Sequence, residues 1–175
     1  MSLQLPEQAD PWRLCEQGKC YEGRVALQDL ARLTSLLNFT GGEAAFTLAF
    51  DRDETRRPRV RGRVCAELQL CCQRCLQSMP LAVDLVFQLS PVTGLEEAER
   101  LPEEYEPLML DEHLLHPMDL VEDELILAIP PAPRHTAADC GVDLTDYRQE
   151  SAPEAAQQKE NPFAPLRVLK HDNDG

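Results

Sequence analysis

Cys72, Cys75, His135 and Cys140 are the residues of this chain whose types and spacing best suit metal chemistry. Cys72 and Cys75 are separated by two residues, a spacing that lets two thiolates approach one tetrahedral metal, as in a zinc knuckle. His135 and Cys140 would supply the second pair of ligands. We therefore take zinc as the candidate cofactor, bound by three cysteines and one histidine that would cross-link two distant parts of the chain.

Two other interpretations of Cys72 and Cys75 stay open from the sequence. One is that all four residues are ordinary packed or surface side chains, because a free thiol behaves as a small hydrophobe. The other is a redox pair, but the cysteines of thioredoxin-type enzymes open a helix that follows a strand. Here the pair closes one predicted strand and precedes Pro80 and another strand. This context disfavours a redox enzyme.

An arginine-rich run is the best candidate for contact with RNA. The formal net charge of the chain is −14, which is unfavourable for binding a phosphate backbone, yet residues 51–75 carry seven arginines against four acids. Arg59, Arg61 and Arg63 alternate along one predicted strand and would form a cationic stripe. The alternative, which we favour, is a solvated face that balances nearby acids. No aromatic residues alternate with the run, so base stacking is not indicated.

The opposite charge is concentrated in residues 96–125, with twelve acids and one arginine. Such a segment repels RNA and attracts basic proteins. Glu122, Asp123 and Glu124 lie near a predicted helix start, where negative charge is stabilised, so capping and solubility are favoured over acid-base catalysis. We keep these three acids as candidates for binding a partner.

Several functional classes are not indicated by the sequence. It lacks a phosphate-binding loop, a Gly-x-Ser-x-Gly nucleophile motif and a His-Glu-x-x-His zinc motif, so we expect neither an enzyme nor a small-molecule substrate. The N-terminus lacks the features of a signal peptide, and no apolar run is long enough to span a membrane. Seven cysteines, an odd number, then favour free thiols in a reducing compartment. We expect a cytoplasmic protein without membrane contact.

The elements that would position these residues follow from the apolar pattern. We predict an extended segment at 11–24, a helix at 25–37, and strands at 45–50, 59–70 and 81–89, of which the last two alternate strictly. A glutamate-rich connection at 94–112 leads to a helix from Pro117 to just before Pro130. The fold class is α+β, an antiparallel β-meander with a few packed helices. We expect one domain over 1–148 and a flexible, partly disordered tail with a short docking motif over 149–175.

Five motifs in order resemble the bacterial YceD proteins, and the resemblance extends over most of the chain. They are Cys72-Gln73-Arg74-Cys75, Leu101-Pro102-Glu103-Glu104-Tyr105-Glu106-Pro107, the segment from Asp119 to Ala128, Pro131-Ala132-Pro133-Arg134-His135 with Cys140, and Asn161-Pro162-Phe163-Ala164-Pro165-Leu166. The four candidate metal ligands fit the family pattern. The arginine run does not.

The resemblance implies an accessory role in the accumulation of 23S ribosomal RNA, through its synthesis, processing or stabilisation. Implied partners are large-subunit ribosomal RNA or its precursor particle, together with ribosomal or assembly proteins. The expected mode of action is docking through the acidic segment. Two alternatives remain from the residues themselves: direct RNA binding by the basic hairpin, and a zinc-stabilised protein-interaction module unrelated to RNA.

Overall fold

The computed structural model describes residues 5–110, 114–136 and 139–141. The chain divides into two units, Met1–Cys140 and Gly141–Gly175, and nearly all described residues belong to the first. The predicted tail at 149–175, with its docking motif, lies outside the described residues. So do Asp111 and Glu112 of the acidic segment.

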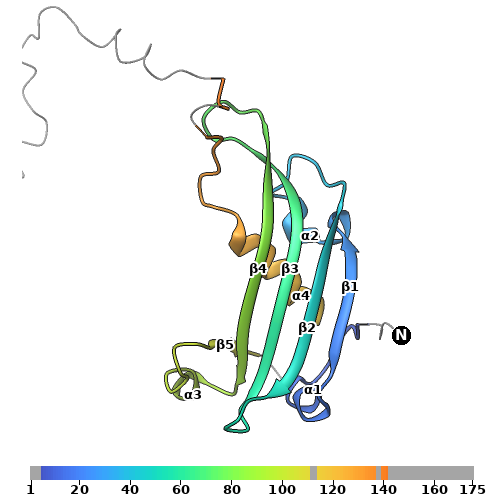
Figure 1. The fold of residues 1–175 in the computed structure, drawn as a ribbon, viewed down its shortest axis with the longest axis vertical. Coiled ribbons are helices and arrows are strands. Elements are labelled where there is room, and N and C mark those ends of the chain that lie inside the picture. Colours follow the sequence, from blue (N-terminus) through green and yellow to red (C-terminus); the bar gives the residue numbers. More distant parts are fainter. Residues whose placement is uncertain (1–4, 111–113, 137–138, 142–175) are drawn as a thin grey trace, which may run out of the picture. The chain divides into compact units, whose positions relative to one another are not determined.

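A five-stranded sheet forms the framework of the first unit (Figure 1). Its strands lie in chain order: β1 (Cys20–Ala26), β2 (Glu43–Arg52), β3 (Pro58–Cys71), β4 (Ser78–Val92) and β5 (Glu106–Met109). The first four are antiparallel neighbours, whereas β5 runs parallel to β4. The predicted α+β class and antiparallel meander are confirmed, with one strand added at each end.

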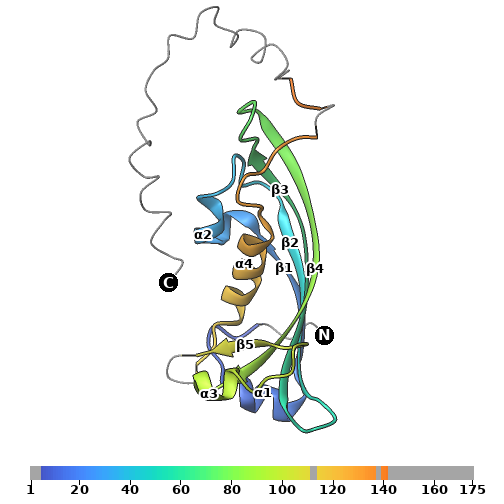
Figure 2. The same ribbon diagram turned by 90° about the vertical axis from the view of Figure 1, so that its left-hand side faces the viewer.

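Alternation along β3 determines which side of the sheet is covered. Val60, Val64, Leu68 and Leu70 are at most 1% exposed, and the arginines between them face the other way. Figure 2 shows α2 and α4 on one side of the curved sheet, which leaves the other side open. Gly62 pairs with Phe87, and a Cβ at this glycine would meet the phenylalanine ring at 1.9 Å. The missing side chain therefore makes room for the ring.

Helix α4 (Pro117–Ala128) covers the buried side of the sheet and confirms the predicted helix. Proline at its first turn is compatible with a helix start, because that position needs no backbone donor. Leu120, Val121 and Leu125 are buried on the face of the helix that meets the sheet. None of the helices within the described residues is both long and apolar enough to cross a membrane.

The prediction of an extended segment at 11–24 is wrong for residues 11–17 and confirmed from Cys20 onward. This part of the chain forms helix α1 (Pro11–Gln17) and then β1. The Asp10 carboxylate accepts the Arg13 N–H at 3.2 Å and caps the helix, which ends at Gly18 in the left-handed region with φ at 59°. An aspartate cap, a proline at the first helical position and a terminal glycine are the ordinary signals of a short helix.

The single helix predicted at 25–37 is also wrong. Strand β1 continues to Ala26, a 3₁₀ turn η1 spans Leu27–Asp29, and helix α2 spans only Ala31–Thr34. Leu27, Leu30 and Leu33 are nonetheless buried. Two short turns can bury leucines three residues apart as well as one long helix can.

The connection predicted at 94–112 contains two further elements. Helix α3 spans Leu95–Ala98, and β5 pairs with only the end of β4, from Leu89 to Val92. Tyr105, just before β5, is buried although its neighbours in sequence are mostly acidic and exposed. It links this connection to the turn between β2 and β3.

Candidate metal centre

The two predicted ligand pairs meet in one cluster. The ligand atoms of Cys72, Cys75, His135 and Cys140 all lie within 4.8 Å of one another, and Cys72 and Cys140 are buried. Sulfur atoms around a tetrahedral zinc ion, each about 2.3 Å from the metal, are about 3.8 Å apart. A small movement of the four ligand atoms toward one another would therefore produce a four-ligand site. Three thiols and one imidazole are a donor set suited to zinc.

A tight turn after β3 positions the first pair. Cys72 N–H donates to the Gln77 carbonyl at 2.9 Å, and Leu76 N–H donates to the Cys72 carbonyl at 2.9 Å. Leu76 adopts the left-handed region, with φ at 59°. This closed turn points both sulfurs toward the same place, which confirms the prediction that Cys72 and Cys75 lie at the second hairpin.

The segment after α4 brings the second pair to this turn. Gln73 N–H donates to the Pro133 carbonyl at 2.8 Å, and His135 N–H reaches the Cys72 sulfur at 3.5 Å. These backbone contacts attach two parts of the chain that are some sixty residues apart. Ligand placement therefore depends on the end of α4 as well as on the hairpin.

The surroundings of the Cys72 sulfur favour its thiolate form. Burial raises its pKa, but backbone N–H groups of Cys75, His135 and Arg74 point at the sulfur and together lower the pKa to about 5. Hydrogen bonds to a charged form favour that form. A metal needs its cysteine ligands deprotonated, so these donors favour metal binding.

Cys75 and His135 respond to the negative sulfur beside them. The Gln77 N–H lowers the pKa of Cys75, yet burial and the thiols of Cys72 and Cys140 leave it raised. Burial lowers the pKa of His135, whereas the Cys72 sulfur raises it, with a net upward shift. Three thiols so close together disfavour three negative charges unless a cation joins them.

The orientation of the His135 ring suits a ligand. Its Nδ1 lies 3.3 Å from the Cys75 sulfur, and its Nε2 lies 3.2 Å from the Ser78 carbonyl oxygen. A proton on Nε2 would be donated to Ser78, which leaves the Nδ1 lone pair facing the cluster. This second contact is of the kind that fixes the tautomer of metal-binding histidines.

Arg74 connects the two ligand pairs through its side-chain hydrogen bonds. Its Nε donates to the Cys140 sulfur at 2.8 Å, and its Nη2 donates to the carbonyls of His135 and Thr136 at 3.4 and 3.2 Å. A zinc ion with three thiolates has one excess negative charge, which this guanidinium would balance. Replacing Arg74 with Met should weaken zinc affinity by about tenfold or more, as observed when outer contacts of metal ligands are removed.

Competition with a chromophoric zinc chelator measures this affinity. Arg74→Lys is the matched control, because it keeps the charge but loses the guanidinium fork, so it should lose less affinity than Met. Equal zinc affinity in the parent and the Met variant would contradict a role for Arg74.

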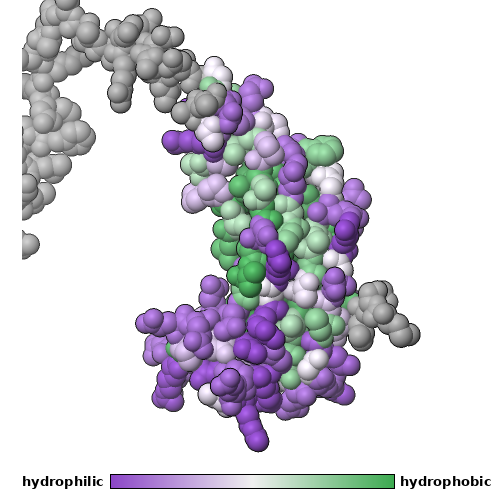
Figure 3. All heavy atoms as spheres, in the orientation of Figure 1, coloured by the Kyte–Doolittle hydropathy of each residue, from purple (hydrophilic) through white to green (hydrophobic). Residues whose placement is uncertain are grey.

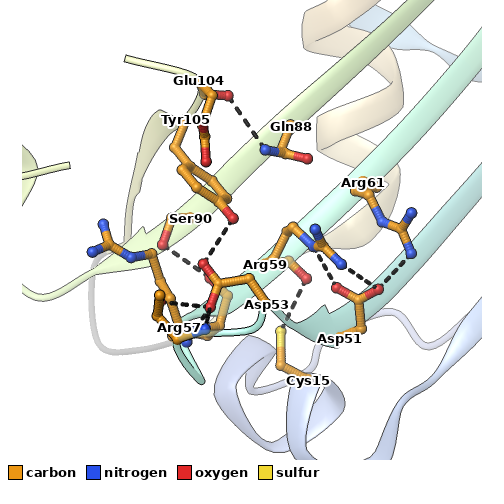
Figure 4. Close-up of polar contacts among 12 residues, drawn as sticks. Cys15, Asp51, Asp53, Arg57, Arg59, Arg61, Gln88, Ser90, Glu104 and Tyr105 are labelled. Atoms are coloured by element: carbon orange, nitrogen blue, oxygen red, sulfur yellow. Dashed lines mark hydrogen bonds and ion pairs between the residues drawn. The ribbon is translucent and has the colours of Figure 1, made fainter. Parts of the chain in front are cut away.

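The predicted arginine stripe is paired with acids, and Figure 4 shows this for Arg59 and Arg61. Arg59 donates to Asp51 at 2.7 and 3.1 Å, and Arg61 donates to the same carboxylate at 2.5 Å. Arg63 donates to Asp84 at 2.9 and 2.8 Å. Two aspartates thus face three arginines, which leaves the stripe a formal charge of +1. RNA binding by the three arginines stays a prediction.

The predicted acidic candidates take different positions. The Glu122 side chain is 8% exposed, and it accepts the N–H groups of Arg32 and Leu33 at 2.7 and 3.0 Å and the Arg32 Nε at 2.9 Å. Asp123 is half exposed and accepts from Arg32 Nη1 at 2.6 Å. Burial, together with the charges of Glu106 and Asp123, raises the pKa of Glu124. Glu122 therefore has an internal structural role that sequence reasoning missed, because Arg32 lies 90 residues away.

The remaining cysteines lie outside the cluster. Cys15 is buried and donates to the Arg59 carbonyl at 3.4 Å, and Cys20 is exposed. Cys65 lies beside Asp84, and the Cys71 thiol contacts the Cys72 carbonyl at 3.8 Å without joining the cluster. The separation of Cys71 from the cluster agrees with the expectation that adjacent residues at a strand end point in opposite directions.

Two comparisons with known proteins find relatives. The sequence profile of the family described as "Large ribosomal RNA subunit accumulation protein YceD" matches residues 60–170, which include all four candidate ligands. A protein of Haemophilus influenzae with that same name is 34% identical over 171 residues. The alignment covers 96% of this chain and 97% of the relative. No solved structure matches the chain.

Proposed function

The chain belongs to the YceD family, and from this membership we propose that it acts in the accumulation of large-subunit (23S) ribosomal RNA. We infer a non-enzymatic accessory factor of large-subunit assembly that works in the cytoplasm. The observation that carries the proposal is the alignment with a named family protein over nearly the full length of both chains. A match of this extent includes the sheet, α4 and the Cys/His cluster, rather than one shared motif.

We propose that the factor docks on basic proteins of the precursor particle through its acidic surface. Glu96 is 92% exposed, and Glu99, Glu103 and Glu104 are exposed as well. Clustered negative charge on a chain of net charge −14 steers basic ribosomal or assembly proteins toward it and accelerates their association. Asp123 could join this surface, whereas the contacts of Glu122 keep it inside the fold.

We further propose that zinc is a structural cofactor. Cys72 and Cys75 would bind it from the hairpin, and His135 and Cys140 would bind it from the segment after α4. When bound, the metal would supply a covalent-strength cross-link between these two segments. The proposed docking surface would then be held on a more rigid support.

Depletion of the protein from growing cells tests the ribosomal role. The ratio of 23S to 16S ribosomal RNA should fall, because only the large subunit depends on the factor, and a plasmid copy of the gene should restore it. The measurement is quantitative electrophoresis or sequencing of total RNA. An unchanged ratio after complete depletion would remove the proposal.

A pull-down of the tagged protein from the same cells tests the docking mode. Basic ribosomal or assembly proteins should be recovered, and less of them as salt is added, because screening weakens attraction between exposed charges. Recovery of partners that are insensitive to salt would contradict docking through the acidic surface.

A further inference from the structure

A small groove of about 260 Å³ lies between the turn that joins β2 to β3 and the segment around α3. Three arginines line it, Arg56 and Arg57 from the turn and Arg100 from just after the helix. The only acidic side chain in its lining is Glu97. We propose that this groove binds backbone phosphate groups of RNA. The proposal rests on the proposed function, which brings the protein to ribosomal RNA.

The arginines of the groove differ from those of the stripe in their partners. Among the described residues, no carboxylate lies within 4 Å of the Arg56 or Arg57 guanidinium, whereas the stripe arginines each contact Asp51 or Asp84. Arg100 is 4.0 Å from Glu96, and both side chains are at least 80% exposed. An exposed pair at that distance is worth little and yields easily to a stronger ligand.

The turn that carries Arg56 and Arg57 is held in place before any ligand arrives. The Asp53 carboxylate accepts from the Thr55 N–H at 2.8 Å, the Thr55 hydroxyl at 2.7 Å and the Arg57 N–H at 2.9 Å. It also accepts the Tyr105 hydroxyl at 2.9 Å (Figure 4). Although burial raises the pKa of Asp53, these donors lower it to about 2, so they hold the carboxylate as an anion.

Tyr105 also supports the arginine that enters the groove. The Arg57 guanidinium lies 5.7 Å from the centre of the Tyr105 ring, close enough for a cation–π contact. This contact restricts the side chain without neutralising its charge. A side chain ordered in advance loses less entropy when it binds.

Glu97 is the feature of the groove that opposes an anion, because hydrogen bonds from Thr93, together with the nearby charge of Arg57, lower its pKa and keep its carboxylate charged. It accepts the N–H and the hydroxyl of Thr93, each at 2.8 Å. Three arginines against one glutamate leave a formal charge of +2 in the lining, in a chain whose total is −14. Figure 3 shows that the end of the molecule near α3 is strongly hydrophilic. The exposed side chains of this segment include Glu96 and Glu99 as well as Arg100.

The chemistry of the lining favours backbone phosphate over bases. A guanidinium binds a phosphate through two parallel hydrogen bonds. The lining offers no aromatic ring on which a base could stack. Contacts to phosphate position a protein on RNA without reading sequence, so the expected binding is weak in sequence preference and strongly dependent on salt.

Fluorescence anisotropy with a labelled single-stranded RNA of about 20 nucleotides and mixed sequence tests the groove, since this length covers several phosphates beyond one site. The test variant combines Arg56→Gln, Arg57→Gln and Arg100→Gln. The matched control combines Arg59→Gln, Arg61→Gln and Arg63→Gln, with the same change in net charge. We expect the groove variant to bind at least about tenfold more weakly, and its salt slope to fall by about 2, because up to three phosphate contacts are lost.

The control variant should bind within about threefold of the parent, because its arginines are already paired. Urea unfolding of both variants verifies that they remain folded. Three results would each contradict RNA binding by the groove. They are equal losses of RNA affinity in the two variants, a loss of RNA affinity only in the control, and no RNA binding by the parent at low salt. Displacement of the RNA by polyglutamate as readily as by unlabelled RNA would also contradict it, because the site would then recognise charge rather than phosphate.

The ribosomal role and RNA binding by the groove can be disproved independently of each other. The ratio of 23S to 16S RNA after depletion does not depend on how the protein contacts its target. A lowered ratio together with unaltered RNA binding by the groove variant would leave the ribosomal role in place and remove the groove.

Discussion

Replacing both Cys72 and Cys75 with Ser is expected to reduce bound zinc from one ion per chain to none. Two of four ligands are lost, and serine hydroxyls do not replace thiolates at neutral pH. The loss also opens the cross-link between Cys72 and Cys140, whose sulfurs belong to one cluster. Chain-entropy arguments for a covalent link that closes a loop of this length give about 4 kcal/mol, which is the expected order of the fall in unfolding free energy.

Native mass spectrometry counts the metal, and urea unfolding measures the stability. Cys71→Ser is the matched control, because Cys71 is adjacent to Cys72 in sequence but not part of the cluster. It should keep its zinc. Zinc retained by the double variant, zinc lost by the control, or a parent protein that is purified without metal would each contradict the site.

Replacing Glu122 with Gln is expected to lower the unfolding free energy by about 2–3 kcal/mol. The carboxylate accepts two backbone N–H groups at the start of α2 and the Arg32 side chain. The amide has nearly the same shape, but its one oxygen cannot serve all three donors and its NH₂ group opposes them. Leu33, whose N–H is one of those donors, is fully buried, so water cannot easily replace the lost bond.

The same contact should be visible in the pH dependence of stability. Burial raises the pKa of Glu122, but the N–H groups of Leu33 and Arg32 and the Arg32 side chain outweigh burial, so the folded-state pKa is lowered. A lowered pKa contributes stability that is present above the unfolded value near pH 4.5 and is lost as the pH falls toward the folded value. The Gln variant should lack this part of the acid dependence.

Asp123→Asn is the matched control for Glu122. It also removes a carboxylate that contacts Arg32, but Asp123 is half exposed. The expected loss of stability is below about 1 kcal/mol. Equal losses at the two positions would show that burial of Glu122 has no special effect, and the internal role described above would be wrong.

The parts of the fold that sequence could predict are those with a strong local pattern. Strict alternation from Arg59 to Leu70 gave the central strand, and the apolar spacing after Pro117 gave α4. The leucines at 27, 30 and 33 have helical spacing, yet the chain meets their burial with two short turns. Periodicity reports which residues are buried more reliably than which backbone buries them.

Pairings between distant segments could not be predicted. The parallel contact of β5 with the end of β4 joins two short stretches whose local sequences do not indicate that they pair. The Arg32–Glu122 contact spans 90 residues, and nothing in either local sequence identifies its partner. Likewise, Asp51 and Asp84 on the neighbouring strands balance two of the three positive charges of the arginine stripe, so the sequence of β3 alone overstates its positive charge.

The candidate metal ligands were easier to find, because few residue types bind a tetrahedral metal and their spacing within each pair is restricted. The sequence predicted all four residues of the cluster. It did not predict the contact of Arg74 with Cys140, although Arg74 lies inside the Cys72–Cys75 turn. Arginine is too common on protein surfaces for its position alone to indicate such a role.

Two contacts determine how late in protein synthesis the fold can be completed: that of Glu122 with α2, and that of Cys72 with Cys140. Glu122 lies in α4 and Cys140 comes after it, so both contacts can form only late in the synthesis of the chain. A ribosome adds only about 5–20 residues per second, so the first four strands emerge seconds before the helix that covers them. During that interval α2 covers the apolar side of the sheet without α4, so the part of that side that α4 buries stays exposed until residue 128 has emerged.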